Sequence, residues 1–326
     1  MPATLDPDFK AAVLNATGAD HLRIESRLQD LWSGYGQILR IGLDGGADPS
    51  VIAKHVRPPT QAVHPRGWHT SASHQRKARS YEVEAHFYRS WSERCGNGCR
   101  VPHFLAYEKR DEEILLVLED LDAAGFPLRK QRVTPAQLDS CLGWLASLHA
   151  TFMGETPDGL WEIGTYWHLD TRSDELAALD DLPLKQAAPT IDRLLNEARF
   201  KTLVHGDAKL ANFCFSEDDR VAAVDFQYVG GGCGVKDLAY FIGSCLDENE
   251  CEAQEAALLD AYFLHLRRSL SEQGSTFDAK DIETEWRRLF PIAWTDFHRF
   301  LKGWSPGHWK INSYSERLAR KVIASL

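Results

Sequence analysis

The segment from Leu203 to Gln227 constrains the fold of this 326-residue chain more than any other. It begins Leu-Val-His-Gly-Asp-Ala-Lys-Leu-Ala-Asn, continues through Phe-Cys-Phe and a charged turn at residues 216–220, and ends Val-Ala-Ala-Val-Asp-Phe-Gln. Its apolar runs predict a short strand, a polar loop, and two more short strands joined by the turn. Asp207 and Asn212 fall on the polar loop, and Asp225 follows a buried strand.

The spacing of these polar residues is typical of phosphoryl-transfer enzymes. Asn212 follows Asp207 by five positions, and Asp225 follows it by eighteen (225 − 207 = 18). In kinases an Asp accepts the proton of the attacking hydroxyl, while an Asn and a second Asp before Phe hold Mg²⁺. An isolated Asp or Asn in a loop more often serves a turn or a cap. The fixed intervals favour the catalytic interpretation.

The pattern His-Gly-Asp-x-x-x-x-Asn with a downstream Asp-Phe-Gln resembles small-molecule kinases of the aminoglycoside and choline kinase type. It is most similar to the ecdysteroid-kinase-like (CHK kinase-like) branch, in which Asp-Phe-Gln replaces Asp-Phe-Gly. Leu-Glu-Asp-Leu at 118–121 and Leu-Ala-Ser-Leu-His-Ala at 145–150 are similar to the same branch. The resemblance covers most of the chain, from about residue 31 to about residue 243.

The resemblance implies a set of cofactors and roles. ATP and Mg²⁺ are the expected cofactors, with Asn212 and Asp225 as Mg²⁺ ligands. Asp207 is expected to orient the acceptor hydroxyl and take its proton. Lys209 would neutralise charge that develops on the γ-phosphate. Asp237 resembles the aspartate that braces the catalytic loop from below, and a helix N-cap is its simpler role.

A lysine inside an apolar strand marks the N-terminal half of the chain. Residues 51–56 predict a strand that contains Lys54, and a buried lysine requires a partner. The following segment, 74–94, has helical periodicity, with Glu84 inside its apolar arc and Glu82 outside it. We predict an ion pair between Lys54 and Glu84, although Glu84 on a solvated face is the alternative. The resemblance assigns Lys54 to the α/β-phosphates.

Two further segments are expected to contact the nucleotide through the backbone. Gly34, Tyr35 and Gly36 lie between predicted strands at 24–31 and 37–43, where backbone N–H groups can approach phosphates closely. An ordinary hairpin is the alternative, because the complete Gly-x-Gly-x-x-Gly is missing. In the resembling family, the segment around Glu119 and Leu121 is the hinge that binds the adenine edge.

The remaining elements are predicted from caps and periodicity. Thr134 and Pro135 mark a helix start, and His149 on that helix is expected to be a hydrogen-bonded core residue. The other expected elements, in chain order, are a helix at 8–20, a loop at 57–73, strands at 104–107 and 114–118, a loop at 160–182, a helix at 189–200, and helices from 252 onward, broken at Gly274 and kinked near Pro291.

These elements predict an α+β, protein-kinase-like fold. Residues 1–120 would form an N-lobe with a mainly antiparallel sheet and one helix, and residues 121–326 a larger, mostly helical C-lobe. Only 12 positions separate Asp225 from Asp237 (237 − 225 = 12), so there is no room for the activation segment with which protein kinases dock peptides. This spacing favours a small substrate.

Composition excludes several functions. A net charge of −10 and a pI near 5.7 argue against a nucleic-acid partner. No window approaches the roughly 18 apolar residues of a membrane span, and the first ten residues lack the features of a signal peptide. Seven cysteines do not suggest a disulfide framework, and Cys95 and Cys99 are expected on a turn rather than in a zinc site. A cytoplasmic enzyme without a membrane or obligate protein partner is expected.

The predicted activity is transfer of the γ-phosphoryl group of ATP to a hydroxyl of a small, largely neutral or apolar molecule. Aromatic residues concentrated after residue 285 suggest an apolar acceptor pocket, although aromatics at helical spacing more often build a core. Acidic residues at 247–255 could instead receive a cation, but they look like a solvated helix start. The alternatives are an aminoglycoside or choline/amino-alcohol kinase, and an inactive nucleotide-binding pseudokinase.

Overall fold

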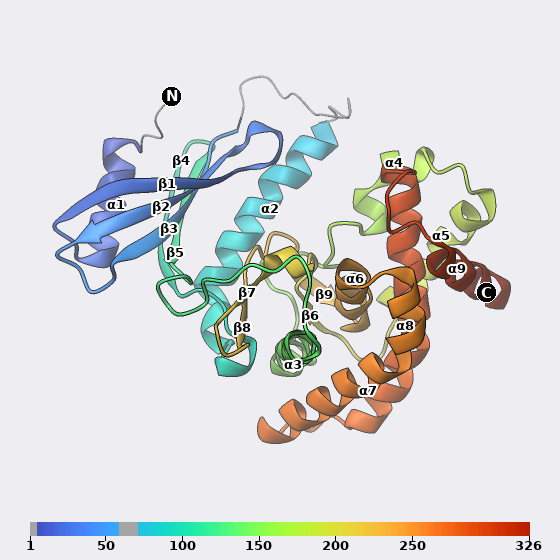
Figure 1. Cartoon of the computed structure of the whole chain (residues 1–326). Helices are drawn as coiled ribbons and strands as arrows, with labels where there is room; N and C mark the ends of the chain where they lie inside the picture. The colour runs from blue at the N-terminus through green and yellow to red at the C-terminus, as the bar shows by residue number, and fades with distance from the viewer. Residues whose placement is uncertain (1–4, 59–70) are drawn as a thin grey trace. The chain divides into compact units, whose positions relative to one another are not determined.

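The computed structural model describes residues 5–58 and 71–326, with Ser71 and Ala72 described by their backbone only. The described chain forms two units. The first comprises residues up to Glu93 together with Val101–Leu128, and the second comprises Arg94–Arg100 together with Arg129–Leu326. An antiparallel sheet dominates the first unit and helices dominate the second, as predicted (Figure 1). The predicted boundary at residues 120/121 falls eight residues before the division at 128/129 (128 − 120 = 8).

The first unit is built on one sheet. Its elements are α1 (Pro7–Thr17), β1 (His21–Asp30), β2 (Gly36–Asp44), β3 (Ser50–Val56), α2 (Ser71–Ser90), β4 (Phe104–Arg110) and β5 (Glu113–Glu119). The strand order is β1-β2-β3-β5-β4, and every neighbouring pair is antiparallel. Short 3₁₀ turns occupy Trp32–Gly34 in this unit, Ser92–Arg94 at the division between the two units, and Asn97–Cys99 in the segment that belongs to the second unit. Most of the loop expected at 57–73, residues 59–70, lies outside the described residues.

Strand alternation puts Lys54 on the face of the sheet that α2 covers. Val51 and Ala53 of β3 pack with Phe9 and Val13 of α1 in one core cluster. Lys54 directly follows Ala53, and successive side chains of a strand alternate between its two faces, so the Lys54 side chain points to the opposite face. On that face, Val56 of β3 and Tyr81 of α2 share a second cluster. The alternation in 51–56 therefore directs the lysine toward the helix in which its partner was predicted.

The second unit is mostly helical. Its elements are α3 (Pro135–Thr151), a 3₁₀ turn (Leu169–Thr171), α4 (Ser173–Ala177), α5 (Leu182–Asn196), β6 (Thr202–Val204), a 3₁₀ turn (Leu210–Asn212), β7 (Phe213–Phe215), β8 (Val221–Ala223), β9 (Gly230–Gly232), α6 (Val235–Cys245), α7 (Glu248–Glu272), α8 (Ala279–Trp304) and α9 (Ser313–Ser325). Helix α3 packs against α7, and α6 packs against α8 (Figure 1). The core of this unit lies among these helices.

Caps explain where the predicted boundaries hold and where they are wrong. Thr134 and Gln137 form a capping box at the start of α3, as its sequence indicated. The helix predicted from Pro189 begins at Leu182, because Asp181 caps it by accepting from the N–H of Leu184. Pro189 lies inside the helix. The loop predicted at 160–182 contains α4, a helix too short to show a clear period.

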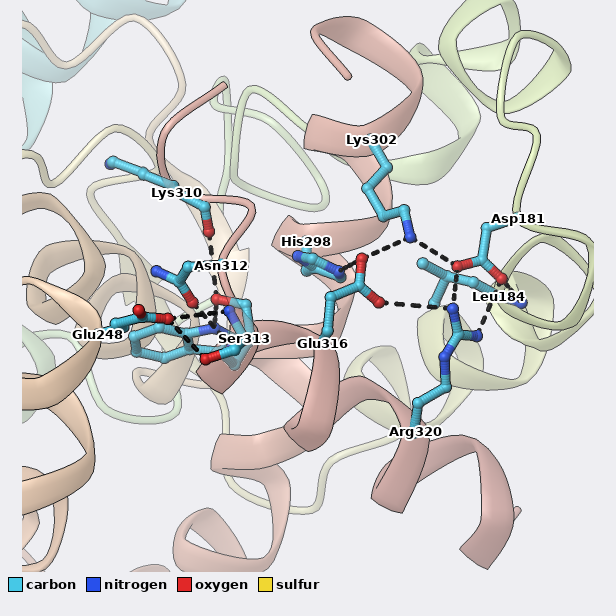
Figure 2. Close-up of polar contacts among 12 residues, drawn as sticks. Asp181, Leu184, Glu248, His298, Lys302, Lys310, Asn312, Ser313, Glu316 and Arg320 are labelled. Carbon is cyan, nitrogen blue, oxygen red and sulfur yellow. Dashed lines mark hydrogen bonds and ion pairs between the residues drawn. The ribbon is translucent and has the colours of Figure 1, made fainter. Parts of the chain in front are cut away.

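The C-terminal helices break at Gly274 as predicted and break again at residues 305–312, while the predicted kink near Pro291 stays a prediction. Gly274 lies beyond the end of α7 in a left-handed conformation, with φ of 64°, and Pro291 lies inside α8. A network of ion pairs holds α9 against the N-terminus of α5 and against α8 (Figure 2). In this network Lys302 Nζ lies 2.7 Å from Asp181 and 2.6 Å from Glu316, and Arg320 also pairs with Asp181.

Candidate active site

Two small ladders hold the polar loop of the 203–227 segment. β6 pairs with β9 and β7 pairs with β8, both antiparallel. The loop at 205–212 leaves β6 and enters β7, and the N–H of Val224 donates to the carbonyl of Asn212 at 3.0 Å. The strands at 213–215 and 221–223 occur where the apolar runs predicted them. This pairing brings the residue before Asp225 into contact with the end of the loop.

Gly206 lets the loop turn where no other residue fits. Its φ is 79°, and a Cβ at this position would lie 2.1 Å from the carbonyl oxygen of Tyr228. The carboxylate of Asp237 accepts from the N–H of His205 at 2.5 Å and from the N–H of Gly206 at 2.9 Å. The brace inferred for Asp237 is therefore present. Its cap role is absent, because α6 begins at Val235 with Gly234 at the N-cap.

His149 supports the brace from the core, as predicted. It is fully buried, and its Nε2 lies 3.2 Å from the carboxylate of Asp237. Its Nδ1 lies 2.7 Å from the hydroxyl of Tyr262, and its ring packs edge-on against Trp286. A histidine that donates from Nε2 and accepts at Nδ1 satisfies both contacts. Its partners assign His149 to the support of the loop rather than to chemistry.

Both oxygens of the Asp207 carboxylate are hydrogen-bonded. Oδ1 accepts from the hydroxyl of Tyr240 at 3.0 Å, and Oδ2 accepts from Lys209 Nζ at 2.9 Å. Asp207 is only 7% exposed, so these partners replace water around its charge. Burial opposes the ammonium form of Lys209, but the charges of Asp207 and Asp225 outweigh it and raise the pKa of Lys209. Lys209 therefore remains a cation beside the carboxylate.

Asn212 is oriented by Asp207. Its Nδ2 donates to the backbone carbonyl of Asp207 at 2.8 Å and to the Asp207 carboxylate at 3.2 Å. These bonds fix which side of the amide faces the loop. Within the part of the chain that the structure describes, no donor bonds to the amide oxygen. An amide oxygen is a suitable ligand for Mg²⁺.

Asp225 occupies a strained backbone conformation. Its φ is 73°, in the left-handed region that a non-glycine residue rarely adopts. Its Oδ1 accepts from Gln227 Nε2 at 2.7 Å, and the carbonyl of Gln227 accepts from Trp161 at 2.8 Å. The glutamine of Asp-Phe-Gln therefore orients the carboxylate that precedes it. Strain of this kind is expected where a side chain must point in a required direction.

The predicted pair in the first unit is present. Lys54 Nζ lies 2.6 Å from Glu84 Oε2, and both residues are buried, at 6% and 2% exposure. Glu82, which fell outside the apolar arc, is more exposed and pairs with Lys109 at 2.5 Å. The choice of Glu84 over Glu82 is thus explained by helix periodicity. A buried ion pair of this kind orients the lysine ammonium.

The hairpin tip makes a backbone hydrogen bond within its own turn. The N–H of Gly34 donates to the carbonyl of Leu31 at 3.1 Å. Tyr35 turns its ring into the core of the first unit, where its hydroxyl lies 2.6 Å from His74 Nδ1. A Cβ at Gly36 would lie 2.1 Å from the carbonyl oxygen of His55, so this close approach requires glycine. Phosphate binding by Gly34, Tyr35 and Gly36 stays a prediction.

The predicted hinge is linked to the strand beside it. The N–H of Glu119 donates to the carbonyl of His103 at 3.0 Å, and its carboxylate accepts from the N–H of His103 at 2.9 Å. Leu121 is buried, and its carbonyl accepts from Phe126 at 2.8 Å. Adenine binding by Glu119 and Leu121 stays a prediction.

Sequence reasoning missed the role of Tyr240. The residue lies on α6 three positions after Asp237, so both side chains can face the same loop. That spacing is the signal that could have found it. Asp237 holds the loop backbone while Tyr240 holds the Asp207 side chain. One helical face therefore fixes both the path of the loop and the carboxylate it presents.

The residues that are described contain no group of three or more His, Cys, Asp or Glu side chains that could hold a metal. Asn212 and Asp225 nevertheless fit Mg²⁺, which is commonly bound by one or two protein ligands plus phosphate oxygens. Among the described helices, none is long and apolar enough to span a membrane.

An antiparallel sheet with a buried lysine–glutamate pair, followed in sequence by a helical unit with this aspartate–asparagine loop, defines a protein-kinase-like phosphotransferase fold. The model of the phosphotransferase enzyme family (APH) matches residues 42–272, more than half of the chain. The chain therefore belongs to this family. A comparison with curated proteins found no match.

Solved structures are similar to this chain at low sequence identity. The amicoumacin kinase hAmiN, in complex with AMP-PNP, Ca²⁺ and Ami, is 14% identical, with 98% of this chain and 93% of that chain covered and a TM-score of 0.53. A microcompartment-associated aminopropanol kinase is 15% identical, with 98% and 94% covered and a TM-score of 0.49. Aminoglycoside phosphotransferase APH(4)-Ia is 12% identical, with 97% and 98% covered and a TM-score of 0.49.

Proposed function

We propose that this phosphotransferase moves the γ-phosphoryl group of ATP to a hydroxyl of a small, largely neutral or apolar molecule. The observation that carries the proposal is the Asp207 carboxylate, which is buried and held at one oxygen by Tyr240 and at the other by Lys209. Such a carboxylate is positioned to orient a hydroxyl and accept its proton. Family membership supplies the reaction class, phosphoryl transfer.

Each remaining polar residue has a role in this proposal. Asp207 accepts the proton of the acceptor hydroxyl as the new P–O bond forms and the bond to the β-phosphate oxygen breaks. Lys209 neutralises charge on the transferred group. Lys54, oriented by Glu84, binds the α/β-phosphates.

ATP and Mg²⁺ are the cofactors of this proposal. Asn212 would offer its amide oxygen and Asp225 its carboxylate to the ion, and both are oriented by hydrogen bonds. Bound Mg²⁺ would supply positive charge that offsets the phosphate oxygens during transfer. The similar amicoumacin kinase was solved with AMP-PNP and Ca²⁺, which supports a nucleotide and a divalent ion in this fold.

The acidic start of α7 supports the proposed acceptor class. A polycationic acceptor would require free carboxylates, but Asp247 and Glu250 form the capping box of α7, and three other acidic residues of this region bond to the segment that contains α9. Glu248 accepts from Ser313, Glu252 pairs with Arg317, and Glu255 accepts from Tyr314. We therefore place a neutral or apolar acceptor ahead of an aminoglycoside or amino alcohol, in keeping with the ecdysteroid-kinase-like pattern of the sequence.

The contrasting function is an inactive nucleotide-binding pseudokinase. All of the polar positions that the chemistry needs are filled by suitable residues: Lys54, Glu84, Asp207, Asn212 and Asp225. A pseudokinase is expected to have lost at least one of them, which favours an active enzyme.

An ATP-consumption screen tests the proposal. The compounds should include sterols, amino alcohols, sugars, aminoglycosides and small hydroxy compounds, each assayed with wild-type protein and with Asp207→Asn. We expect turnover of a neutral or apolar alcohol that is lost in the variant. Preferential turnover of aminoglycosides would overturn the acceptor class, and the absence of any Asp207-dependent turnover would favour the pseudokinase.

A further inference from the structure

A second amine lies close to the catalytic aspartate. Lys310 belongs to the segment between α8 and α9, and its Nζ lies 4.8 Å from the ring centroid of Tyr240. The ring centroids of Phe297 and Trp309 both lie 5.5 Å from the same nitrogen. The hydroxyl of Tyr240 donates to Asp207. A single aromatic ring therefore separates this ammonium from the base.

Lys310 Nζ has no polar partner among the residues that the structure describes. Its side chain extends away from Asn312 and Ser313, while its backbone carbonyl accepts from Ser315 at 3.2 Å (Figure 2). Lys302 in the same view bonds to two carboxylates. Aromatic faces compensate a cation only in part. The Lys310 ammonium is thus partly withdrawn from water, and no carboxylate of the described residues bonds to it directly.

The electrostatic surroundings agree with this geometry. Burial lowers the pKa of Lys310 to about 8. The charged and titratable groups that face it are Cys245, Asp207 and Cys251, which act to raise the pKa, and Lys209, which acts to lower it. Near neutral pH most of the population is therefore charged. An anion that bound to Lys310 would restore the pKa toward its ordinary value.

An exposed aromatic ring lies next to this ammonium. Trp309 is 60% exposed, although a large indole is more often buried. Its ring stacks on His308 at 5.8 Å and lies within reach of Lys310 Nζ. A cation beside an exposed apolar ring suits a ligand that has an apolar body and an acidic group.

We propose that Lys310 binds a carboxylate of the acceptor while Trp309 covers its apolar body and Asp207 meets its hydroxyl. The acceptor is then a small hydroxy acid with an apolar body. This inference rests on the proposed function and revises its acceptor class: the body of the molecule stays apolar, but the molecule carries one acidic group and is not neutral. It also gives Lys310 a role in specificity, separate from the role of Lys209 on the transferred phosphoryl group.

Binding of benzoate tests the site without any turnover. Benzoate has an apolar ring and a carboxylate but no hydroxyl, so it can bind and cannot react. We expect calorimetric titration to show affinity that falls about tenfold to hundredfold in Lys310→Met, because a charge-assisted hydrogen bond is lost. Lys310→Arg should retain most of the affinity, and Trp309→Leu should weaken it. Lys321→Met, at an exposed lysine of α9, is the matched control and should bind as wild type.

The pH dependence of benzoate binding gives a second readout. The pKa of Lys310 is about 8, below its ordinary value, so the ammonium is lost as the pH rises through that range. Affinity should therefore fall between about pH 7 and about pH 9 in wild type and stay level in Lys310→Arg, because arginine remains charged. Affinity that does not change with Lys310→Met, or that falls equally in Lys310→Arg, would overturn the site.

Turnover of a matched pair tests the acceptor class. 4-(Hydroxymethyl)benzoate and 4-(hydroxymethyl)benzamide share the ring and the hydroxyl and differ in charge. We expect the acid to have the higher kcat/KM in wild type, and Lys310→Met to remove the preference. Equal use of acid and amide in wild type would overturn this inference while leaving the kinase assignment intact. Benzoate binding that depends on Lys310 supports the site even if neither compound turns over, in which case the proposed reaction is at fault.

Discussion

The hydroxyl of Tyr240 donates a hydrogen bond to the carboxylate of Asp207 at 3.0 Å, in the interior of the helical unit. Tyr240 is 4% exposed, so water does not readily replace this contact. Burial and the neighbouring charge of Asp207 raise the pKa of Tyr240, which keeps the phenol protonated and able to donate. This hydrogen bond therefore restricts the Asp207 carboxylate to one preferred orientation.

Loss of this bond should slow the reaction without weakening the fold greatly. In Tyr240→Phe the ring stays, so its packing on Phe297 and Lys310 is retained. We expect kcat to fall about tenfold, by the loss of one hydrogen bond to a charged group, with little change in the Kd for MgATP. Steady-state kinetics on an acceptor from the screen, with a melting curve for each variant, measure both effects.

Tyr166→Phe is the control for Tyr240→Phe. The hydroxyl of Tyr166 donates to Tyr240 at 3.3 Å and, in the described part of the chain, makes no hydrogen bond to Asp207. Its removal should affect kcat less than the removal of the Tyr240 hydroxyl. An equal fall of kcat in both variants would contradict a specific role for Tyr240.

The metal assignment predicts a loss that depends on Mg²⁺. Asp225→Ala should weaken ATP binding strongly when Mg²⁺ is present and little when it is absent, because the carboxylate acts through the ion. Calorimetric titration with and without Mg²⁺ measures the difference. Asp218→Ala is the control, since Asp218 lies on the turn between β7 and β8 and pairs with Arg220 at the surface. Equal weakening under both conditions would point to a structural role for Asp225.

The ion pairs of Lys54 and Lys109 predict that substitutions at two glutamates of α2 have unequal effects on stability. Glu84→Gln removes the buried carboxylate that pairs with Lys54, and breaking a buried ion pair costs about 3–5 kcal/mol in the free energy of unfolding. Glu82→Gln breaks only a partly exposed pair with Lys109, worth about 0–1 kcal/mol. Urea unfolding of each variant, with ATP titration alongside, measures the contrast. Similar losses in the two variants would show that Lys54 does not depend on Glu84.

Periodicity and caps explain how much of the fold the sequence could predict. The alternation around Lys54 and the apolar arc around Glu84 identified a pair that lies 2.6 Å apart in the structure. Thr134 marked the start of α3 through local chemistry alone. Pro189 predicts a helix start, but the cap at Asp181 begins α5 at Leu182 and leaves the proline inside the helix. Proline usually marks a helix start, but tertiary packing can place it inside a helix.

The candidate site also contains residues that the sequence could predict and residues that it could not. Asp207, Asn212 and Asp225 are close in sequence, so their spacing carried the prediction. Tyr240 and Lys310 reach the same site from a helix and an interhelical segment that are distant in sequence. The spacing of Tyr240 from Asp237 on α6 could have indicated the tyrosine, but one lysine among aromatic residues gives no pattern, and only tertiary packing brings Lys310 to the site. Contacts of this kind become visible with the tertiary structure.

The central claim is that Asp207 acts as the base of an ATP-dependent phosphoryl transfer. The most direct measurement compares wild type with Asp207→Asn, with calorimetry for MgATP binding and phosphoryl transfer to an acceptor identified by the screen. We predict a Kd for MgATP that is nearly unchanged and a kcat that falls by about two to four orders of magnitude, the range typical of a general base. A variant that turns over as fast as wild type would contradict the claim.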